Sequence, residues 1–167
     1  MPRTHEHGKL TIRPMARGDA TAVVEMAREL AAVLDDPEPA LDPNDLVRDG
    51  IGPERWFDCV VAEVGGRLIG YAMVCRGYEA HMAKRRLWLS DLYVQAHARR
   101  TGAGRALMVA VARLAMAQGC EAVYWDLWGL NRVGKAFYES LGAVEDGDLA
   151  IWRVASSRRA AAGGKEE

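Results

Sequence analysis

The stretch "ARRTGAGRAL" (98–107) decides the fold of this chain, because it places three arginines and two glycines directly before a run with helical spacing. A strand-like segment, "LWLSDLYV" (87–94), precedes it. The first N–H groups of a helix have no partner within the helix, and the helix dipole adds partial positive charge there. Glycine at positions 102 and 104 lets the backbone come close to a bulky anion. The pattern therefore predicts a phosphate or pyrophosphate site at a helix N-terminus.

Two common nucleotide motifs do not account for this turn. A P-loop requires Gly-x-x-x-x-Gly-Lys-Ser/Thr, which the chain lacks, and a dinucleotide fingerprint requires a third glycine where Leu107 stands. A turn with two glycines is a weak signal when taken alone. A sharp turn with solvated arginines therefore remains the alternative interpretation at this stage.

Composition narrows the class of protein. The chain has 167 residues, which favours one domain, and 50% of them are hydrophobic, enough for a sizeable core. Charged residues make up 27% and the net charge is −1, which argues against a basic nucleic-acid surface and a polybasic membrane anchor. Neither a membrane-length apolar run nor the apolar middle of a signal peptide occurs, so we expect a cytoplasmic protein without nucleic-acid or membrane partners.

The cysteines and histidines predict neither a disulfide framework nor a metal site. The three cysteines are an odd number and include no Cys-x-x-Cys pair, so we interpret them as small buried hydrophobic residues. His5 and His7 lie in a terminus that we expect to be frayed. We predict disorder over residues 1–9 and 155–167, and one domain over 10–154.

Periodicity and turn residues predict strands and helices in a definite order. The expected strands cover 10–15, 56–64, 68–75, 87–94, 122–128 and 148–154. The turn "GGR" (65–67) joins the second and third of these strands as a hairpin, and 76–86 is expected to be a polar connection. The expected helices cover 19–34 with Asp19 as cap, 44–50, 103–118 ended by Gly119, and 131–142 between Asn131 and Gly142. This order indicates a mixed sheet with helices packed on it.

The sequence from Arg99 to Gly104, Arg-x-x-Gly-x-Gly after "LYV", resembles the pyrophosphate-binding motif of the GNAT acetyltransferase superfamily. The resemblance continues in "N-x-x-x-x-x-F-Y-x-x-x-G" from Asn131 to Gly142. The ordered segments "IRP", "ELA", "DLVRDGIG", "CVVAEV", "GYAM" and "LSDLYV" are similar to the diamine acetyltransferases, the spermidine/spermine and thialysine type, over about residues 10–154. The resemblance implies an α/β fold with a single GNAT domain and a mixed, mostly antiparallel sheet flanked by helices.

The same resemblance implies acetyl-coenzyme A as co-substrate, no metal, and a set of residues that bind it. The turn holds the diphosphate through Arg99, Arg100, Thr101, Gly102, Ala103, Gly104 and Arg105. The backbone of Leu92, Tyr93 and Val94 receives the pantetheine arm and the thioester carbonyl, because in the family this strand splays from its neighbour. Asn131 contacts the cofactor, and Gly134 permits its close approach to the helix.

Tyr138 is the expected general acid, which protonates the departing thiolate. Val133, Phe137 and Leu141 form an apolar stripe beside it and are expected in the core. Ser90 stands where diamine acetyltransferases carry a glutamate, and a serine can position a water but cannot hold the proton of an ammonium group. Strand alternation puts Ser90 and Asp91 on opposite faces unless a bulge intervenes, so the general base stays open.

Acceptor binding is expected at the acidic loop with Asp35 and Asp36, and at Trp125 and Asp126 on the strand before the tyrosine helix. A solvated loop and a core tryptophan are the alternatives. The resemblance implies acetyl transfer by direct attack of a small primary amine, which is a diamine, a polyamine or an amino-acid-like molecule. It also implies a homodimer. Three alternatives stay open: a peptide or aminoglycoside acceptor, a non-catalytic acyl-coenzyme A-binding module, and transfer through a cysteine.

Overall fold

The computed structural model describes residues 8–147 and Ile151. The chain divides into two units, one up to Trp125 and one from Asp126 onward, and each is described by itself. Within the described part of the chain, none of the helices has the length and apolar character needed to cross a membrane. The predicted disorder at 1–7 and 155–167, and the strand at 148–154 apart from Ile151, lie outside the described residues.

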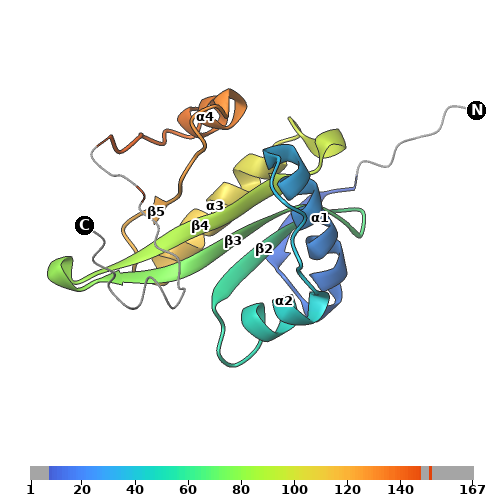
Figure 1. Cartoon of the computed structure of the whole chain (residues 1–167), viewed down its shortest axis with the longest axis horizontal. Helices are drawn as coiled ribbons and strands as arrows, with labels where there is room; N and C mark the ends of the chain where they lie inside the picture. The colour runs from blue at the N-terminus through green and yellow to red at the C-terminus, as the bar shows by residue number, and fades with distance from the viewer. Residues whose placement is uncertain (1–7, 148–150, 152–167) are drawn as a thin grey trace, which may run out of the picture. The chain divides into compact units, whose positions relative to one another are not determined.

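A five-stranded sheet forms the first unit (Figure 1). Its strands follow chain order: β1 (Leu10–Pro14), β2 (Phe57–Val64), β3 (Arg67–Glu79), β4 (Lys84–Val94) and β5 (Val123–Tyr124). The first four strands pair antiparallel, and β5 pairs parallel with β4. The expected mixed, mostly antiparallel sheet is confirmed.

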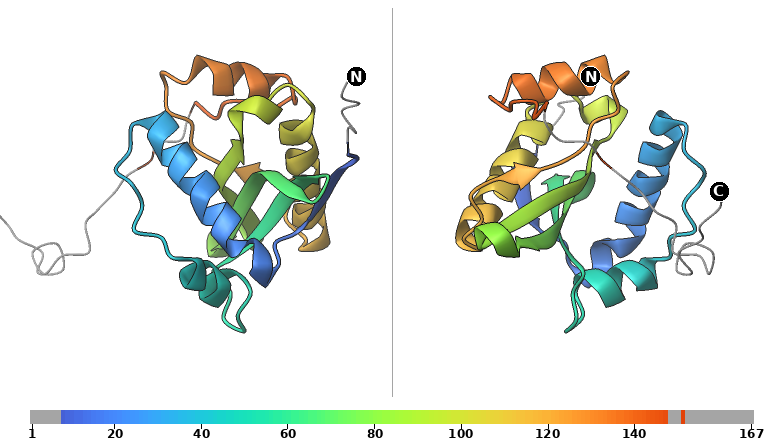
Figure 2. Two further views of the ribbon diagram at one scale, coloured as in Figure 1. Left: turned by 90° about the vertical axis from the view of Figure 1, so that its right-hand side faces the viewer. Right: turned by 60° about the vertical axis from the view of Figure 1, so that its left-hand side comes forward.

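Helices cover both faces of this sheet (Figure 2). On one face lie α1 (Ala20–Leu34) and α2 (Pro43–Gly50), and their apolar side chains bury Tyr71 and Val61 of the sheet completely. On the other face lies α3 (Ala103–Ala117), whose Leu107 and Val111 are buried. The second unit contains α4 (Arg132–Glu139). The helices at 103–118 and 131–142 are confirmed with slightly shorter bounds, and Gly119 and Gly142 end them with positive φ.

The β2–β3 hairpin turns at Gly65 and Gly66, both with positive φ, as "GGR" predicts. The polar connection predicted at 76–86 is wrong, because β3 and β4 continue through it as a second hairpin around a short 3-10 turn, Ala80–Met82. Arg86 supports this hairpin by pairing with Glu79 and by stacking 4.3 Å from the ring centroid of Tyr124. The hairpin carries many exposed residues, so its sequence lacks the alternation of a half-buried strand.

Two further local predictions need correction. Asp19 does not cap α1 with its side chain; its carboxylate accepts hydrogen bonds from Arg13 at 2.6 and 3.0 Å and from the backbone N–H of Ala16 at 2.7 Å. The Asp19 carboxylate therefore closes the 3-10 turn Arg17–Asp19, which precedes α1. The strand predicted at 122–128 contains only Val123 and Tyr124, because only these two residues pair with β4.

Candidate active site

The turn between β4 and α3 leaves a helix N-terminus open. Gly102 is the residue before α3, and it adopts φ 92° and ψ −6°, a left-handed conformation that L side chains rarely take. Because Gly102 has no side chain, it offers no cap to the first N–H groups of the helix. Thr101 Oγ1 donates instead to the carbonyl of Ala98 at 2.7 Å, which closes the turn from inside. These features fit a phosphate or diphosphate group.

The arginines of the turn, Arg99, Arg100 and Arg105, lie next to this N-terminus in sequence, and all three are exposed. Arg99 Nε donates to the carbonyl oxygen of Val94 at 3.0 Å, and its guanidinium lies 5.7 Å from the ring centroid of Tyr93. Arg100 holds a left-handed φ of 63°, unusual for a residue with a side chain. Arg99 thus ties the turn to the end of β4.

The end of β4 has one edge that the sheet does not use. On one side, Leu92 and Tyr93 pair with Ala72 and Tyr71 of β3. On the other side, the pairing with β5 stops at Trp88, so within the described residues no strand pairs with positions 89–94 on that edge. The last residues of β4 therefore lie beyond its pairing with β5. Backbone groups on an unpaired strand edge are available to hydrogen-bond a ligand.

A β-bulge in β4 decides which way the residues before this edge point. Met73 of β3 pairs with Asp91 and Val74 pairs with Leu89, so Ser90 is the extra residue. The Ser90 hydroxyl donates to the carbonyl of Met73 at 3.2 Å and lies 4.0 Å from Cys75 Sγ. The bulge breaks the alternation, and Ser90 and Asp91 reach the same face of the sheet, the one that carries α1.

Asp91 lies against the core on that face. The hydroxyl of Tyr71, itself fully buried, donates to Asp91 Oδ2 at 3.3 Å. Burial raises the pKa of the Asp91 carboxyl, and the hydrogen bond from Tyr71 opposes this only in part. Sequence reasoning assigned Asp91 no definite role, since a bulge cannot be read from strand alternation.

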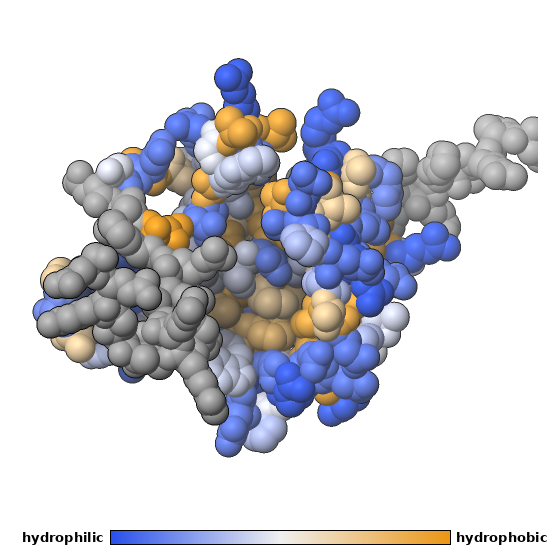
Figure 3. Space-filling model, in the orientation of Figure 1, coloured by the Kyte–Doolittle hydropathy of each residue, from blue (hydrophilic) through white to orange (hydrophobic). Residues whose placement is uncertain are grey.

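A second carboxylate, that of Glu29 on α1, lies beside the end of β4. It accepts a hydrogen bond from the hydroxyl of Tyr93 at 2.9 Å and another from Nε2 of Gln95 at 3.1 Å. Burial and the neighbouring Glu29 raise the pKa of Tyr93. Sequence reasoning missed Glu29, because a glutamate on an exposed helix position carries no signal of its partners. Figure 3 shows that hydrophobic side chains also reach the surface in this view.

Two of the predicted acceptor residues, Asp35 and Asp36, lie directly after α1. Asp35 ends α1 in a left-handed conformation, the N–H of Asp36 donates to the carbonyl of Ala31 at 2.9 Å, and both carboxylates are exposed. Trp125, half-buried, is the last residue of the first unit, and Asp126, exposed, begins the second.

In the second unit, Asn131 caps α4 by accepting a hydrogen bond from the N–H of Gly134 at 2.8 Å. A Cβ on Gly134 would lie 2.7 Å from Asn131 Nδ2, so the group that approaches this glycine closely is the capping side chain. Burial, followed by the charge of Asp126, raises the pKa of Tyr138 to about 12. The core position expected for Val133 is wrong, since its side chain is 84% exposed.

The cysteines are mostly buried, as expected for Cys59 and Cys120, while Cys75 is half-buried. Burial raises the pKa of the Cys59 thiol to about 12, so it carries almost no thiolate at neutral pH.

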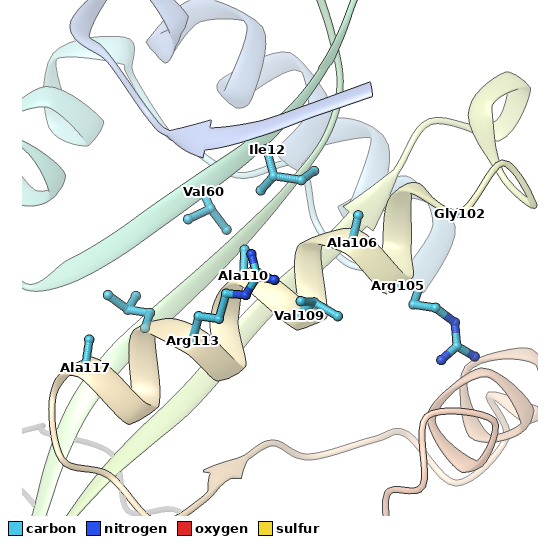
Figure 4. Close-up of a pocket in the computed structure, with 10 residues that line it drawn as sticks. Ile12, Val60, Gly102, Arg105, Ala106, Val109, Ala110, Arg113 and Ala117 are labelled. Atoms are coloured by element: carbon cyan, nitrogen blue, oxygen red, sulfur yellow. The ribbon is translucent and has the colours of Figure 1, made fainter. Parts of the chain in front are cut away.

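A groove of about 790 Å³ runs along α3 on the other face of the sheet (Figure 4). Ile12 and Val60 form one wall, and Ala110 and Leu114 of α3 line it. The apolar side chains of α3 are therefore divided between the core, at Leu107 and Val111, and the groove, at Ala110 and Leu114.

Comparisons with known proteins agree with this geometry. The acetyltransferase (GNAT) family matches residues 23–143. Because this match covers more than half of the chain, the chain belongs to the GNAT family of acetyltransferases, and it is an enzyme of that class.

Two curated relatives are amine acetyltransferases. A thialysine N-epsilon-acetyltransferase of Sus scrofa is 30% identical over 151 residues, which cover 84% of this chain and 88% of the relative. A spermidine/spermine N(1)-acetyltransferase-like protein of Homo sapiens is 31% identical over 153 residues, 86% of this chain, and the matched part spans only 22% of that longer protein. An aminoglycoside acetyltransferase from an uncultured soil metagenomic sample, solved with sisomicin, shares the fold with a TM-score of 0.73 at 19% identity, over 88% of this chain and 97% of that one.

Proposed function

We propose that this chain transfers the acetyl group of acetyl-coenzyme A to the primary amine of a small cationic substrate, by direct attack of the amine on the thioester. One observation carries the proposal: the uncapped N-terminus of α3 adjoins the unpaired edge of β4, and Arg99 joins the two. The N-terminus of α3 suits a diphosphate, and the unpaired edge of β4 suits a pantetheine arm.

Each group of residues has a distinct task in this proposal. The turn from Arg99 to Arg105 holds the diphosphate with backbone N–H groups and positive charge. The backbone of Leu92, Tyr93 and Val94 orients the thioester, and an N–H aimed at its carbonyl oxygen stabilises the charge that develops there, an effect worth about 3 kcal/mol. Ser90, fixed on the carbonyl of Met73, positions water beside the acceptor.

Tyr138 supplies the proton for the departing thiolate. A pKa of about 12 keeps the phenol protonated throughout the neutral range, as a proton donor requires. Asn131 and Gly134 shape the start of the helix that carries it. These assignments rest on the family resemblance and on the properties of α4 itself.

A diamine, a polyamine or an amino-acid-like amine is the acceptor that we favour. The support comes from the names of the relatives and from carboxylates on the first unit that can attract an ammonium group, Glu29 near the end of β4 and Asp35 and Asp36 after α1. Trp125 and Asp126 are proposed as acceptor contacts on the family resemblance alone. Homodimerisation and a cytoplasmic location are expected from the resemblance and from composition, and light scattering of the purified chain tests the first.

The direct test measures thiol release from acetyl-coenzyme A with spermidine, thialysine, sisomicin and a short lysine peptide as acceptors. We expect turnover with spermidine or thialysine, and at least a tenfold loss of coenzyme A affinity for Gly102→Ala, because alanine is strained at φ 92° and moves the turn. Arg113→Gln, an exposed arginine farther along α3, is the matched control and should bind coenzyme A normally.

A non-catalytic acyl-coenzyme A-binding module is the second reading, favoured by Ser90 in place of a carboxylate. It predicts tight coenzyme A binding without turnover on any acceptor. Turnover with sisomicin or the peptide alone would replace the small-amine assignment, and failure to bind coenzyme A would overturn the proposal altogether. Tyr138→Phe should lower kcat and leave coenzyme A affinity intact.

A further inference from the structure

The carboxylate of Asp91 occupies an unusual place for a charged group. It lies on the α1 face of β4, next to the fully buried Tyr71, and the Tyr71 hydroxyl is its hydrogen-bond donor at 3.3 Å. Among residues 8–147, no lysine or arginine forms an ion pair with it. A carboxylate at the margin of a core without a cationic partner costs free energy of folding, so packing alone gives no reason for a charged residue here.

Its position in the strand supplies that reason. Asp91 is the residue immediately before Leu92–Val94, the segment whose free edge is proposed to orient the thioester. The bulge at Ser90 turns Asp91 away from the α3 face, where Leu89 is buried, and toward the face of Ser90 and Trp88, both exposed. The carboxylate therefore borders an open strip of β4 beside the segment where acetyl transfer would take place.

We propose that Asp91 is the general base of this enzyme, taking the proton from the acceptor ammonium group, and that Tyr71 is the positioning residue that holds it. This inference rests on the proposed function. The ammonium N–H bond breaks and the carboxylate gains the proton, leaving a neutral amine with a free lone pair. The amine nitrogen bonds to the thioester carbonyl carbon and the C–S bond breaks. Tyr138, the proposed acid, protonates the departing thiolate, and the second amine proton restores the Tyr138 phenol. Asp91 then returns its proton to water.

The electrostatics of the site support this role. Burial raises the pKa of Asp91 above that of an ordinary aspartate, which makes the carboxylate a stronger base. The other titratable groups that face this part of the sheet from the packed elements are Cys59 on β2, Tyr71 on β3, Tyr93 on β4, Glu29 on α1 and Asp19 before α1. The thiol and both phenols have raised pKa values, so they stay neutral where a carboxyl group titrates.

The experiment is the pH dependence of kcat/KM with spermidine or thialysine, whichever the wild-type enzyme acetylates. Asp91→Asn should lower kcat/KM at pH 7 at least about a hundredfold, and its profile should follow only the titration of the acceptor amine. Asp91→Glu should recover part of the rate. Tyr71→Phe should shift the acidic limb to higher pH, because the hydrogen bond from Tyr71 lowers the pKa of Asp91.

Glu25→Gln is the matched control, an exposed carboxylate on α1 with no part in the proposed site, and it should leave kcat/KM and the midpoint of the acidic limb unchanged. Coenzyme A affinity and the melting temperature, measured for each variant, separate a catalytic loss from misfolding. An Asp91→Asn enzyme that is folded, binds coenzyme A and keeps the wild-type rate and acidic limb would overturn the inference while leaving the proposed function standing. A wild-type chain inactive on every amine would instead overturn the proposed function.

Discussion

Asn131 Oδ1 accepts a hydrogen bond of 2.8 Å from the backbone N–H of Gly134, and the same side chain fills the space where a Cβ of residue 134 would lie. The capping side chain in the first turn of α4 thus explains why residue 134 is a glycine. The sequence predicted that another group lies close to Gly134. In the structure this group is the Asn131 side chain that caps the helix.

Gly134→Ala should consequently fail to stabilise the protein. Alanine inside a helix normally improves stability by about 1 kcal/mol over glycine. Here the new Cβ would sit 2.7 Å from Asn131 Nδ2 and displace the cap, which costs about the same amount. Thermal unfolding of Gly134→Ala, Asn131→Ala and the double variant measures the balance. The glycine substitution should stabilise only where Asn131 is already alanine; equal effects in both backgrounds would contradict the steric argument.

Gly70→Ala should destabilise the protein by about 1–3 kcal/mol. Gly70 is buried opposite Val94, and a Cβ there would lie 2.6 Å from the carbonyl oxygen of Tyr93, a backbone atom that cannot move aside without shifting β4. Gly77→Ala, in the exposed part of the same strand, is the control, since its nearest contact would be 3.9 Å. Chemical denaturation should place the control close to the wild type.

Asp19→Asn should destabilise the protein at neutral pH and much less in acid. Hydrogen bonds from Arg13 hold the pKa of Asp19 below its usual value. A group whose folded pKa is lowered stabilises the native state above its unfolded pKa, and this contribution disappears as pH falls through the folded pKa. Because Arg13 is 34% exposed, we expect only about 1–2 kcal/mol at pH 7. Equal losses at pH 7 and pH 3 would exclude this origin.

The effect of Asp91→Asn on stability should depend on pH in the opposite direction. The pKa of Asp91 is raised by burial, so its contribution to stability is fully present below the unfolded pKa and is lost as pH rises through the folded pKa. At pH 7–8 the asparagine variant should therefore melt at the same temperature as the wild type or higher, and near pH 4 its advantage should vanish. A lower melting temperature at pH 8 than at pH 4, relative to the wild type, would show that Asp91 serves stability in its charged form.

The sequence alone determined the elements that depend on local chemistry. Glycines at 65 and 66 predicted the hairpin turn, and Gly119 and Gly142 predicted helix ends, because positive φ is a property of single residues. The turn 98–107 predicted an open helix N-terminus for the same reason. The same reasoning failed for the polar stretch 76–86, because a strand exposed on both faces does not alternate apolar and polar residues.

Only the tertiary structure decided the relationships that pass between strands and helices. The bulge at Ser90 depends on the register of β4 against β3, and it alone brings Ser90 and Asp91 to one face. Tyr71 contacts Asp91, 20 residues away, and Tyr93 contacts Glu29, 64 residues away. Both contacts arise from packing, and no local sequence pattern indicates them. Local sequence sets the backbone conformation of each residue, whereas strand register and helix packing select the neighbours that give a side chain its chemistry.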